Sequence, residues 1–166
     1  MNYSDIHSLS VFKAFTPYQL EVIEPFIEFC SFPADMVIFQ QGDQAENFYI
    51  LTSGEIALHF KPYDGPSLVI SKITSDNVFG WSAVLKRDTY STAAVTTCEI
   101  TAIRMSISNL QSLCAIDPVL STLFLDSLVG VISEKMKNSH QEFLALFSSG
   151  MNFGSDSIRS TNGNGT

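Results

Sequence analysis

The sequence is poor in basic residues, and in arginine most of all. Seventeen Asp and Glu side chains stand against nine Lys and Arg, which gives a formal net charge of −8. The arginines are Arg87, Arg104 and Arg159. Tight binding to nucleic acid or to an anionic membrane surface needs clustered Lys and Arg side chains. We therefore expect no direct nucleic-acid partner and no membrane partner.

Cysteine and histidine are also scarce. Cys30, Cys98 and Cys114 lie far apart and form no CxxC pair. An odd number of cysteines without a signal peptide indicates reduced thiols in a cytoplasmic protein, and we expect each to be a small buried side chain. The three histidines have no metal-ligand spacing. No Ser/His/Asp, Cys/His or paired-carboxylate arrangement stands out, so we expect no enzyme, no catalytic residue, no metal and no cofactor.

Apolar stretches of about 18 residues, the length of a membrane-spanning helix, are absent. The chain of 166 residues, 45% hydrophobic, is long enough to bury a substantial core. We expect one domain over residues 1–148. Residues 149–166 are rich in Gly, Ser and Asn and predict a disordered tail.

Short alternating runs separated by turns dominate the middle of the chain. The runs that predict strands are residues 36–43, 47–60, 67–73 and 98–105. A tight turn is expected at Leu51–Gly54 and a looser hairpin at Lys61–Ser67. Alternation places four side chains toward the core: Val37, Phe39, Phe48 and Ile50. Many short strands with regular turns are typical of a barrel or jelly roll.

Helical patterns flank the strands. Residues 4–26 predict two short helices, the second capped by Thr16 with Pro17 in its first turn. After Arg104, residues 106–116 predict a short helix, and Asp117-Pro118 begins a long one. A helix from residue 118 to residue 147 would be about 45 Å long.

Residues 37–60 combine these turn and strand signals in one pattern. Its members, in order, are Gln41-Gly42-Asp43, Glu46, Phe48-Tyr49 and Ser53-Gly54-Glu55. Their order and spacing resemble the first half of the cyclic-nucleotide-binding domain, the sensor barrel of Crp/Fnr-type regulators. The resemblance covers about residues 9–140. It implies a mainly β fold: a β jelly roll (double-stranded β-helix) with N-terminal helices and a long C-terminal helix.

The family's phosphate-binding cassette corresponds here to FGWSAVL, which begins at Phe79. The resemblance implies F-G-E-x-A-L in a nucleotide binder, with the Glu on a ribose hydroxyl and an Arg about ten residues later on the cyclic phosphate. This sequence has Trp81 for the Glu and Thr89 or Tyr90 near the Arg position. Arg87 would reach that position only if the loop shifts by about two residues. The candidate ligand-binding residues are Phe79, Gly80, Trp81, Ser82, Ala83, Arg87, Thr89, Tyr90 and Ser91.

Three interpretations of Trp81 stay open. The indole fills the pocket, or it stacks on a small anionic or aromatic ligand, or a cyclic nucleotide binds despite the changes. Gly80, Ser82 and Ala83 would offer backbone N–H groups and a hydroxyl that suit an anion. The site is therefore expected to be degenerate for cyclic nucleotides.

The long helix from Pro118 carries an apolar stripe at Leu120, Phe124, Leu128 and Ile132 that continues to Phe143 and Phe147. The resemblance implies that this helix dimerises the sensor and relays ligand occupancy, so we expect a homodimer through it. The alternative is a helix folded back on its own barrel. Two functions follow: a regulatory ligand-sensing module, which signals to a separate protein partner, or a ligand-free protein-interaction and dimerisation module on a degenerate barrel.

Overall fold

The computed structural model describes the backbone of residues 3–152 and the side chains of residues 6–137. The chain divides into two units, residues 1–132 and residues 133–166. The first unit contains all the strands of the described region. The second unit, as far as it is described, continues the last helix to Asn152. The tail expected over residues 149–166 falls, from residue 153 onward, outside the described residues.

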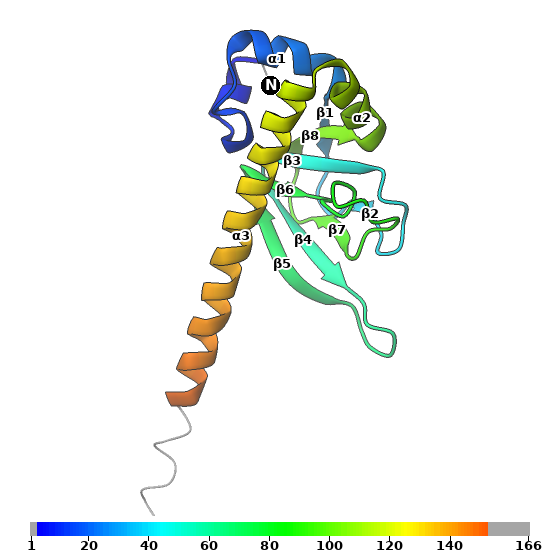
Figure 1. Ribbon diagram of the computed structural model, residues 1–166. Coiled ribbons are helices and arrows are strands. Elements are labelled where there is room, and N and C mark those ends of the chain that lie inside the picture. The colour runs from blue at the N-terminus through cyan, green and yellow to red at the C-terminus, as the bar shows by residue number, and fades with distance from the viewer. Residues whose placement is uncertain (1–2, 153–166) are drawn as a thin grey trace, which may run out of the picture. The chain divides into compact units, whose positions relative to one another are not determined.

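The strands form two four-stranded antiparallel sheets (Figure 1), in the orders β1-β8-β3-β6 and β2-β7-β4-β5. Their bounds are β1 Glu28–Phe32, β2 Val37–Phe39, β3 Asn47–Ser53, β4 Glu55–Phe60, β5 Leu68–Thr74, β6 Asn77–Phe79, β7 Ala93–Thr96 and β8 Ile100–Ser106. Apart from the hairpin of β4 and β5, neighbours in each sheet come from distant parts of the chain, as in a jelly roll. This architecture confirms the mainly β fold with flanking helices.

Helices lie at both ends of the described region. Their bounds are η1 Tyr3–Ser8, η2 Ser10–Phe12, α1 Pro17–Ile23, η3 Glu24–Phe26, α2 Ile107–Ile116 and α3 Pro118–Asn152. The first of the two helices expected within residues 4–26 is instead a pair of short 3₁₀ segments. Residues Ile6, Leu9 and Phe12 still point to the core, because helical spacing persists over such short turns.

The helix starts follow the capping residues that the sequence supplies. Thr16 and Gln19 form a capping box at α1: the Thr16 hydroxyl accepts the Gln19 N–H, and the Gln19 side chain accepts the Thr16 N–H. The hydroxyl of Ser106 caps α2, and Asp117 Oδ1 accepts the Leu120 N–H at the start of α3. The boundaries read from these residues are confirmed.

The expected turn at Leu51–Gly54 is the β3–β4 connection. Gly54 has φ +88°, and a side chain there would meet the Glu99 carbonyl oxygen, so glycine is required. One inward assignment is wrong: Val37 is 41% exposed. The pairing of β2 with β7 shifts register between Val37 and Phe39, which breaks the alternation that the assignment assumed.

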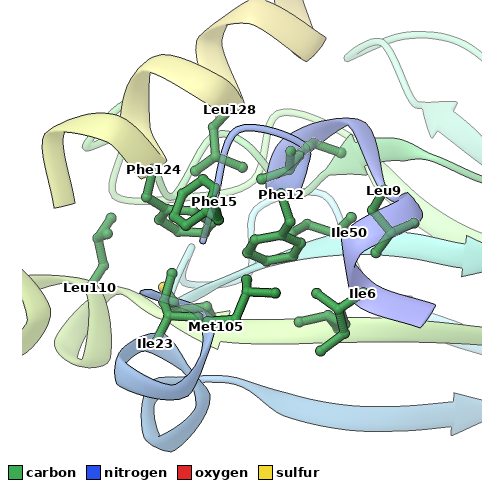
Figure 2. Packing of buried hydrophobic residues seen from close by; sticks show 14 of the residues in the cluster. Ile6, Leu9, Phe12, Phe15, Ile23, Ile50, Met105, Leu110, Phe124 and Leu128 are labelled. Carbon is green, nitrogen blue, oxygen red and sulfur yellow. The ribbon is translucent and has the colours of Figure 1, made fainter. Parts of the chain in front are cut away.

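One face of sheet β1-β8-β3-β6 packs against the helices (Figure 2). We call this cluster the helix-side core. Its buried members include Ile6, Leu9, Phe12, Phe15, Ile23, Phe48, Ile50, Met105, Leu110, Phe124 and Leu128. Phe124 of α3 is its centre: its ring lies 5.7 Å from that of Phe12, 6.3 Å from Phe15 and 6.2 Å from Phe48. These rings fix the first turns of α3 to the sheet.

The opposite face of the same sheet points into the barrel. This barrel core contains Phe39, Tyr49, Leu51, Ile56, Leu58, Ile73, Phe79, Tyr90, Ala94, Ile100 and Ala102. The alternation along β3 explains the division, because Phe48 and Ile50 face the helices while Tyr49 and Leu51 face the barrel.

The apolar stripe expected to dimerise α3 is used largely within this chain. Leu120, Phe124 and Leu128 are 2%, 0% and 0% exposed in the helix-side core, and Ile132 packs against the same cluster. For these positions the alternative of a helix packed on its own barrel describes the structure, because the N-terminal 3₁₀ segments and α1 supply the covering apolar surface. The side chains of Phe143 and Phe147 lie outside the described residues.

Candidate functional site

The segment from Phe79 to Ser91 leaves strand β6 as a tightly coiled loop. Within it, the Ala83 N–H donates to the Gly80 carbonyl at 3.2 Å, the Leu85 N–H to Trp81 at 3.0 Å and the Arg87 N–H to Ser82 at 3.0 Å. The N–H of Ala83, one of the groups expected to face an anion, is therefore occupied within the loop itself.

Gly80 makes the sharp exit from β6 possible. Its φ is +72°, and a Cβ atom there would lie 3.0 Å from the Asn47 carbonyl oxygen and 3.3 Å from the Tyr49 ring. Only glycine fits this left-handed conformation and this close approach without strain. The backbone at Gly80 thus closely approaches the protein's own strand β3.

Two serine hydroxyls face each other across the loop. Ser82 is buried, and its Oγ lies 3.4 Å from the Oγ of the exposed Ser91. The same Ser82 oxygen also accepts the Ser91 N–H at 3.5 Å. Trp81, beside Ser82, is half-buried. The pair of hydroxyls can offer hydrogen bonds to a ligand but no positive charge.

Tyr90 ties the loop to the turn before β3. Its hydroxyl donates to the Asn47 carbonyl at 2.6 Å and accepts the Asn47 N–H at 3.1 Å. Its backbone N–H donates to the Asp43 carbonyl, and its carbonyl accepts the Gly42 N–H, both at 2.9 Å. Burial raises the pKa of the Tyr90 phenol, so the side chain stays neutral.

Aromatic rings fill the barrel beneath the loop. The Tyr90 ring stacks on Phe39 with centroids 3.8 Å apart, and Tyr49 stacks on Phe79 at 4.8 Å. Phe39 links the two pairs, at 6.1 Å from Tyr49 and 6.3 Å from Phe79. Burial also raises the pKa of Tyr49 to about 12. This four-ring stack is apolar in its centre and neutral at ordinary pH.

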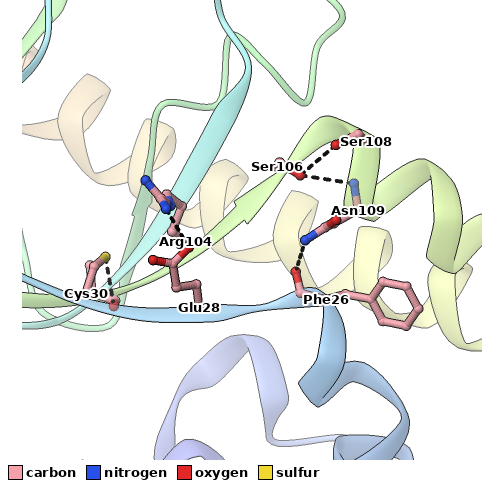
Figure 3. Close-up of polar contacts among 8 residues, drawn as sticks. Phe26, Glu28, Cys30, Arg104, Ser106, Ser108 and Asn109 are labelled. Carbon is pink, nitrogen blue, oxygen red and sulfur yellow. Dashed lines mark hydrogen bonds and ion pairs between the residues drawn. The ribbon is translucent and has the colours of Figure 1, made fainter.

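The described residues include two arginines, Arg87 and Arg104, and neither places an unpaired guanidinium group in this four-ring stack. Arg87 is exposed on the loop. Arg104 of β8 forms an ion pair with Glu28 of β1, its partner across the strands (Figure 3). Arg104 is also paired with Tyr49 across β8 and β3, and its positive charge lowers the pKa of that phenol against the larger effect of burial. Arg159 lies outside the described residues.

Figure 3 places the same ion pair beside Cys30, whose thiol donates to the Ala102 carbonyl at 3.3 Å. Burial raises the pKa of Cys30 to about 11, so the thiol is protonated and unreactive at neutral pH. The expectation that every cysteine is buried is wrong for Cys98, which is exposed beside the Gly54 turn. Nearby, the Asn109 side chain donates to the Phe26 carbonyl and joins α2 to the start of β1 (Figure 3).

The structure brings together only some of the candidate ligand-binding residues. Phe79, Gly80, Ser82, Ala83 and Tyr90 are buried and converge where the loop meets the barrel. The outer members, Arg87, Thr89 and Ser91, are exposed on the loop. The sequence interpretation missed Asn47 as the partner of Tyr90, and it treated Phe39 as ordinary core and Tyr49 only as part of the Phe48-Tyr49 pair. The aromatic side chains of Phe39 and Tyr49 were the signal available in the sequence.

Two features are absent from the described part of the chain. No group of three or more His, Cys, Asp or Glu side chains in it is arranged to hold a metal ion. No helix in the same part is long and apolar enough to cross a membrane.

Comparison with known families gives one domain match. The family model for the cyclic nucleotide-binding domain matches residues 29–117, more than half of the chain. The match begins in β1 and ends just before α3, so it includes both sheets and the whole loop of the candidate site.

Similar proteins of known sequence or structure agree with this match. A CRP-like cAMP-activated global transcriptional regulator of Mycobacterium tuberculosis is 20% identical over 136 residues, which are 82% of this chain and 59% of that protein. The chain thus spans about three fifths of that relative. A cyclic nucleotide-binding domain from Methylobacillus flagellatus superposes with a TM-score of 0.75 at 16% identity, over 86% of this chain and 80% of that one. A cyclic nucleotide-binding protein from Geobacter metallireducens gives 0.70 at 19%, over 82% and 98%.

Proposed function

Since the chain belongs to the cyclic nucleotide-binding domain family, we propose that it is a regulatory sensor module whose barrel does not hold cyclic AMP or cyclic GMP tightly. The module senses a different small ligand or signals directly to a protein partner. The observation that carries this proposal is the four-ring stack of Phe39, Tyr49, Phe79 and Tyr90 beneath a loop without an inward cation.

The energetic argument concerns the phosphate. A charge-assisted hydrogen bond to a phosphate contributes about 1.5–3 kcal/mol, and a phosphate buried without such a partner is costly. In this loop Ser82 and Ser91 offer hydroxyls only, and Arg87 is exposed. The lost charge and the lost ribose carboxylate together would weaken binding by several orders of magnitude, at tenfold per about 1.4 kcal/mol.

Calorimetry with purified protein tests this proposal directly. We expect cyclic AMP and cyclic GMP to bind with dissociation constants weaker than about 10 μM, for the charge reasons given above. Tighter binding by either nucleotide would contradict the proposal. In that case Arg87→Ala, compared with Lys86→Ala at the adjacent exposed position, would reveal whether Arg87 moves in to meet the phosphate.

The alternative function is a ligand-free interaction module on the same barrel. It is favoured by the way Tyr90 satisfies both backbone groups of Asn47 and so closes the barrel internally. Trp81 distinguishes the two functions because it is the sole tryptophan of the chain. A ligand at the loop should change the indole fluorescence, whereas a ligand-free module should give no change with any small molecule while still capturing its protein partner.

We also propose that the protein acts as a homodimer through α3, using a stripe that shares only Ile132 with the part of the expected stripe described above. Leu125, Val129, Ile132 and Met136 follow one another at spacings of four, three and four residues. This spacing is typical of a coiled-coil seam. Val129 and Met136 are more than half exposed, so they are available for pairing.

Light scattering tests the dimer. We expect about twice the chain mass of 18.3 kDa at low micromolar concentration. Val129→Asp combined with Met136→Asp should give a folded monomer, because carboxylates cannot be buried in the seam without partners. Gly130→Asp, at an exposed position of α3 that lies off the seam and has open space around it, is the matched control and should remain dimeric. A wild type of single-chain mass at all concentrations would contradict dimerisation.

The setting we propose is cytoplasmic and regulatory rather than enzymatic. The excess of acidic residues supports a module that does not itself bind DNA. Electrophoretic mobility of duplex DNA should stay unchanged at physiological salt when the protein is added; a shift would contradict this part of the proposal.

A further inference from the structure

A groove lies on the outer face of sheet β2-β7-β4-β5, away from the barrel core. Its volume is about 530 Å³, and the lining residues used below are Gln40, His59, Lys61, Tyr63, Ser67 and Ala93. Ala94 and Leu58 point into the barrel core, so their neighbours Ala93 and His59 face outward. Ala93 and His59 are also direct partners across β7 and β4. The groove is therefore separate from the aromatic stack.

The floor of this groove is a small side chain between two strands. Ala93 faces outward and yet is only 8% exposed. The walls lie on both sides of it: the end of β2 at Gln40, and the end of β4 with the following hairpin loop at Lys61 and Tyr63. Volumes of about 300–1,000 Å³ are usual for sites that bind small molecules.

The two walls are held together by one amide side chain. Gln41 Oε1 accepts the Lys61 N–H at 2.8 Å, and Gln41 Nε2 donates to the Lys61 carbonyl at 3.2 Å. The Gln40 N–H donates to the Asp43 carboxylate at 2.8 Å, which fixes the turn on the other side. The groove is thus preformed, and a ligand need not order its walls.

The charges around the groove favour an anion. Lys61 and His59 line it, and no carboxylate does, although the chain carries a net charge of −8. The ion pairs formed by the described side chains are Lys72 with Glu55 and Arg104 with Glu28, so Lys61 is in neither. The nearest carboxylate along the chain on the β2 side, Asp43, already accepts a backbone hydrogen bond.

Apolar contact is available beside these polar groups. The Tyr63 ring is fully exposed, with no other part of the described structure covering it. Pro62 lines the groove next to it. An exposed ring at the rim of a cationic groove is suited to stack on a flat ligand.

We propose that this outer groove binds a small organic anion with a flat apolar body, such as an aryl carboxylate. The Lys61 ammonium meets the carboxylate, Gln40 and Ser67 offer hydrogen bonds, and Tyr63 stacks on the body of the ligand over the floor at Ala93. This site is independent of the barrel and of the function proposed for it.

Nuclear magnetic resonance titration of the full chain with 2-naphthoate tests the proposal. We expect the backbone amides of Lys61 and Ala93 to shift with a dissociation constant of about 1 mM or tighter, as ordinary ligand efficiency gives for a molecule of this size. The neutral 2-naphthamide should bind at least tenfold more weakly. Equal binding of the amide, or shifts confined to Gly80 and Ser82 in the barrel, would overturn the proposal.

Two variants sharpen the test. Lys61→Met keeps the aliphatic stem and should weaken naphthoate binding about tenfold or more, the effect of losing one charge-assisted hydrogen bond. Lys13→Met, at an exposed lysine outside the groove, is the control and should change nothing. Equal loss in both variants would mean unspecific attraction and would overturn the site. Ala93→Val raises the floor and should weaken binding independently of charge.

Discussion

One sheet of this protein separates two apolar cores of different chemistry. The helix-side core, as far as its side chains are described, is built from aliphatic side chains and phenylalanine rings without a tyrosine. The barrel core, on the other face of strands β3 and β8, contains Tyr49 and Tyr90 stacked with Phe39 and Phe79. The helix-side core is stabilised by close packing and burial alone, whereas the tyrosine hydroxyls of the barrel core also need hydrogen-bond partners. Residues that serve stability alone are therefore concentrated on the helix side.

The largest expected effect comes from emptying the helix-side core at Phe124. Phe124→Ala should lower the free energy of unfolding by about 3–5 kcal/mol, because the cavity lies among Phe12, Phe15 and Phe48. Urea denaturation gives the value. Val119→Ala, on the same helix but 79% exposed, should cost less than about 0.5 kcal/mol. Similar values for the two would show that Phe124 does not anchor α3 in the helix-side core.

The stability lost on replacing Trp81 shows how far the barrel core extends under the loop. Trp81→Ala should lower the free energy of unfolding by about 2 kcal/mol, because the indole is half-buried. This value lies between those expected for an indole that fills the pocket and for one at its open rim. Leu85→Ala, an exposed position in the same loop, is the control. A loss of about 3–5 kcal/mol would identify Trp81 as pocket filler, and one below about 1 kcal/mol would identify it as a platform at the rim.

Tyr90 tests the polar requirement of the barrel core. Tyr90→Phe keeps the ring on Phe39 but removes both hydrogen bonds to Asn47, so unfolding should become about 1 kcal/mol easier. Tyr63→Phe, at a fully exposed ring, should leave stability unchanged. No difference between the two variants would show that water replaces the Tyr90 hydroxyl at no cost.

The smallest effect is confined to alkaline pH. Burial raises the pKa of Tyr49 from 10.0 to about 12 in the folded protein. The stabilisation from the neutral phenol is complete below pH 10 and is lost as the pH rises through about 12. Ultraviolet difference titration should detect late-ionising phenols, since burial also raises the pKa of Tyr90, and the one that ionises near pH 12 should disappear in Tyr49→Phe. Ionisation of all tyrosines in a single step near pH 10 would contradict this expectation.

The fold was predictable because its signals are local. Thr16, Ser106 and Asp117 cap helices by bonds within four residues, and Gly54 turns the chain by its own φ. The inward position assigned to Val37 was not predictable in the same way, because the register shift of β2 arises from its pairing with β7, far along the chain.

The sequence predicted which segment forms the candidate site, but it did not predict how the side chains of that segment are arranged. The sequence placed Gly80, Trp81 and Tyr90 in one loop, and the structure agrees. It did not reveal that Tyr90 turns inward onto Phe39, since such a contact depends on where β2 runs beside the loop. The covering of Leu120, Phe124 and Leu128 by the N-terminal segments was likewise a matter of tertiary packing, which an apolar stripe alone cannot distinguish from a dimer seam.

The bonds of Tyr90 have a consequence for local opening of the fold. The amide protons of Gly42, Asn47 and Tyr90 itself all depend on where this one residue sits. We therefore expect the loop and the turn before β3 to open together in hydrogen exchange, although they are separated by more than 40 residues along the chain. A molecule that loosens the loop would release all three amides to solvent together, and one that tightens it would protect them together.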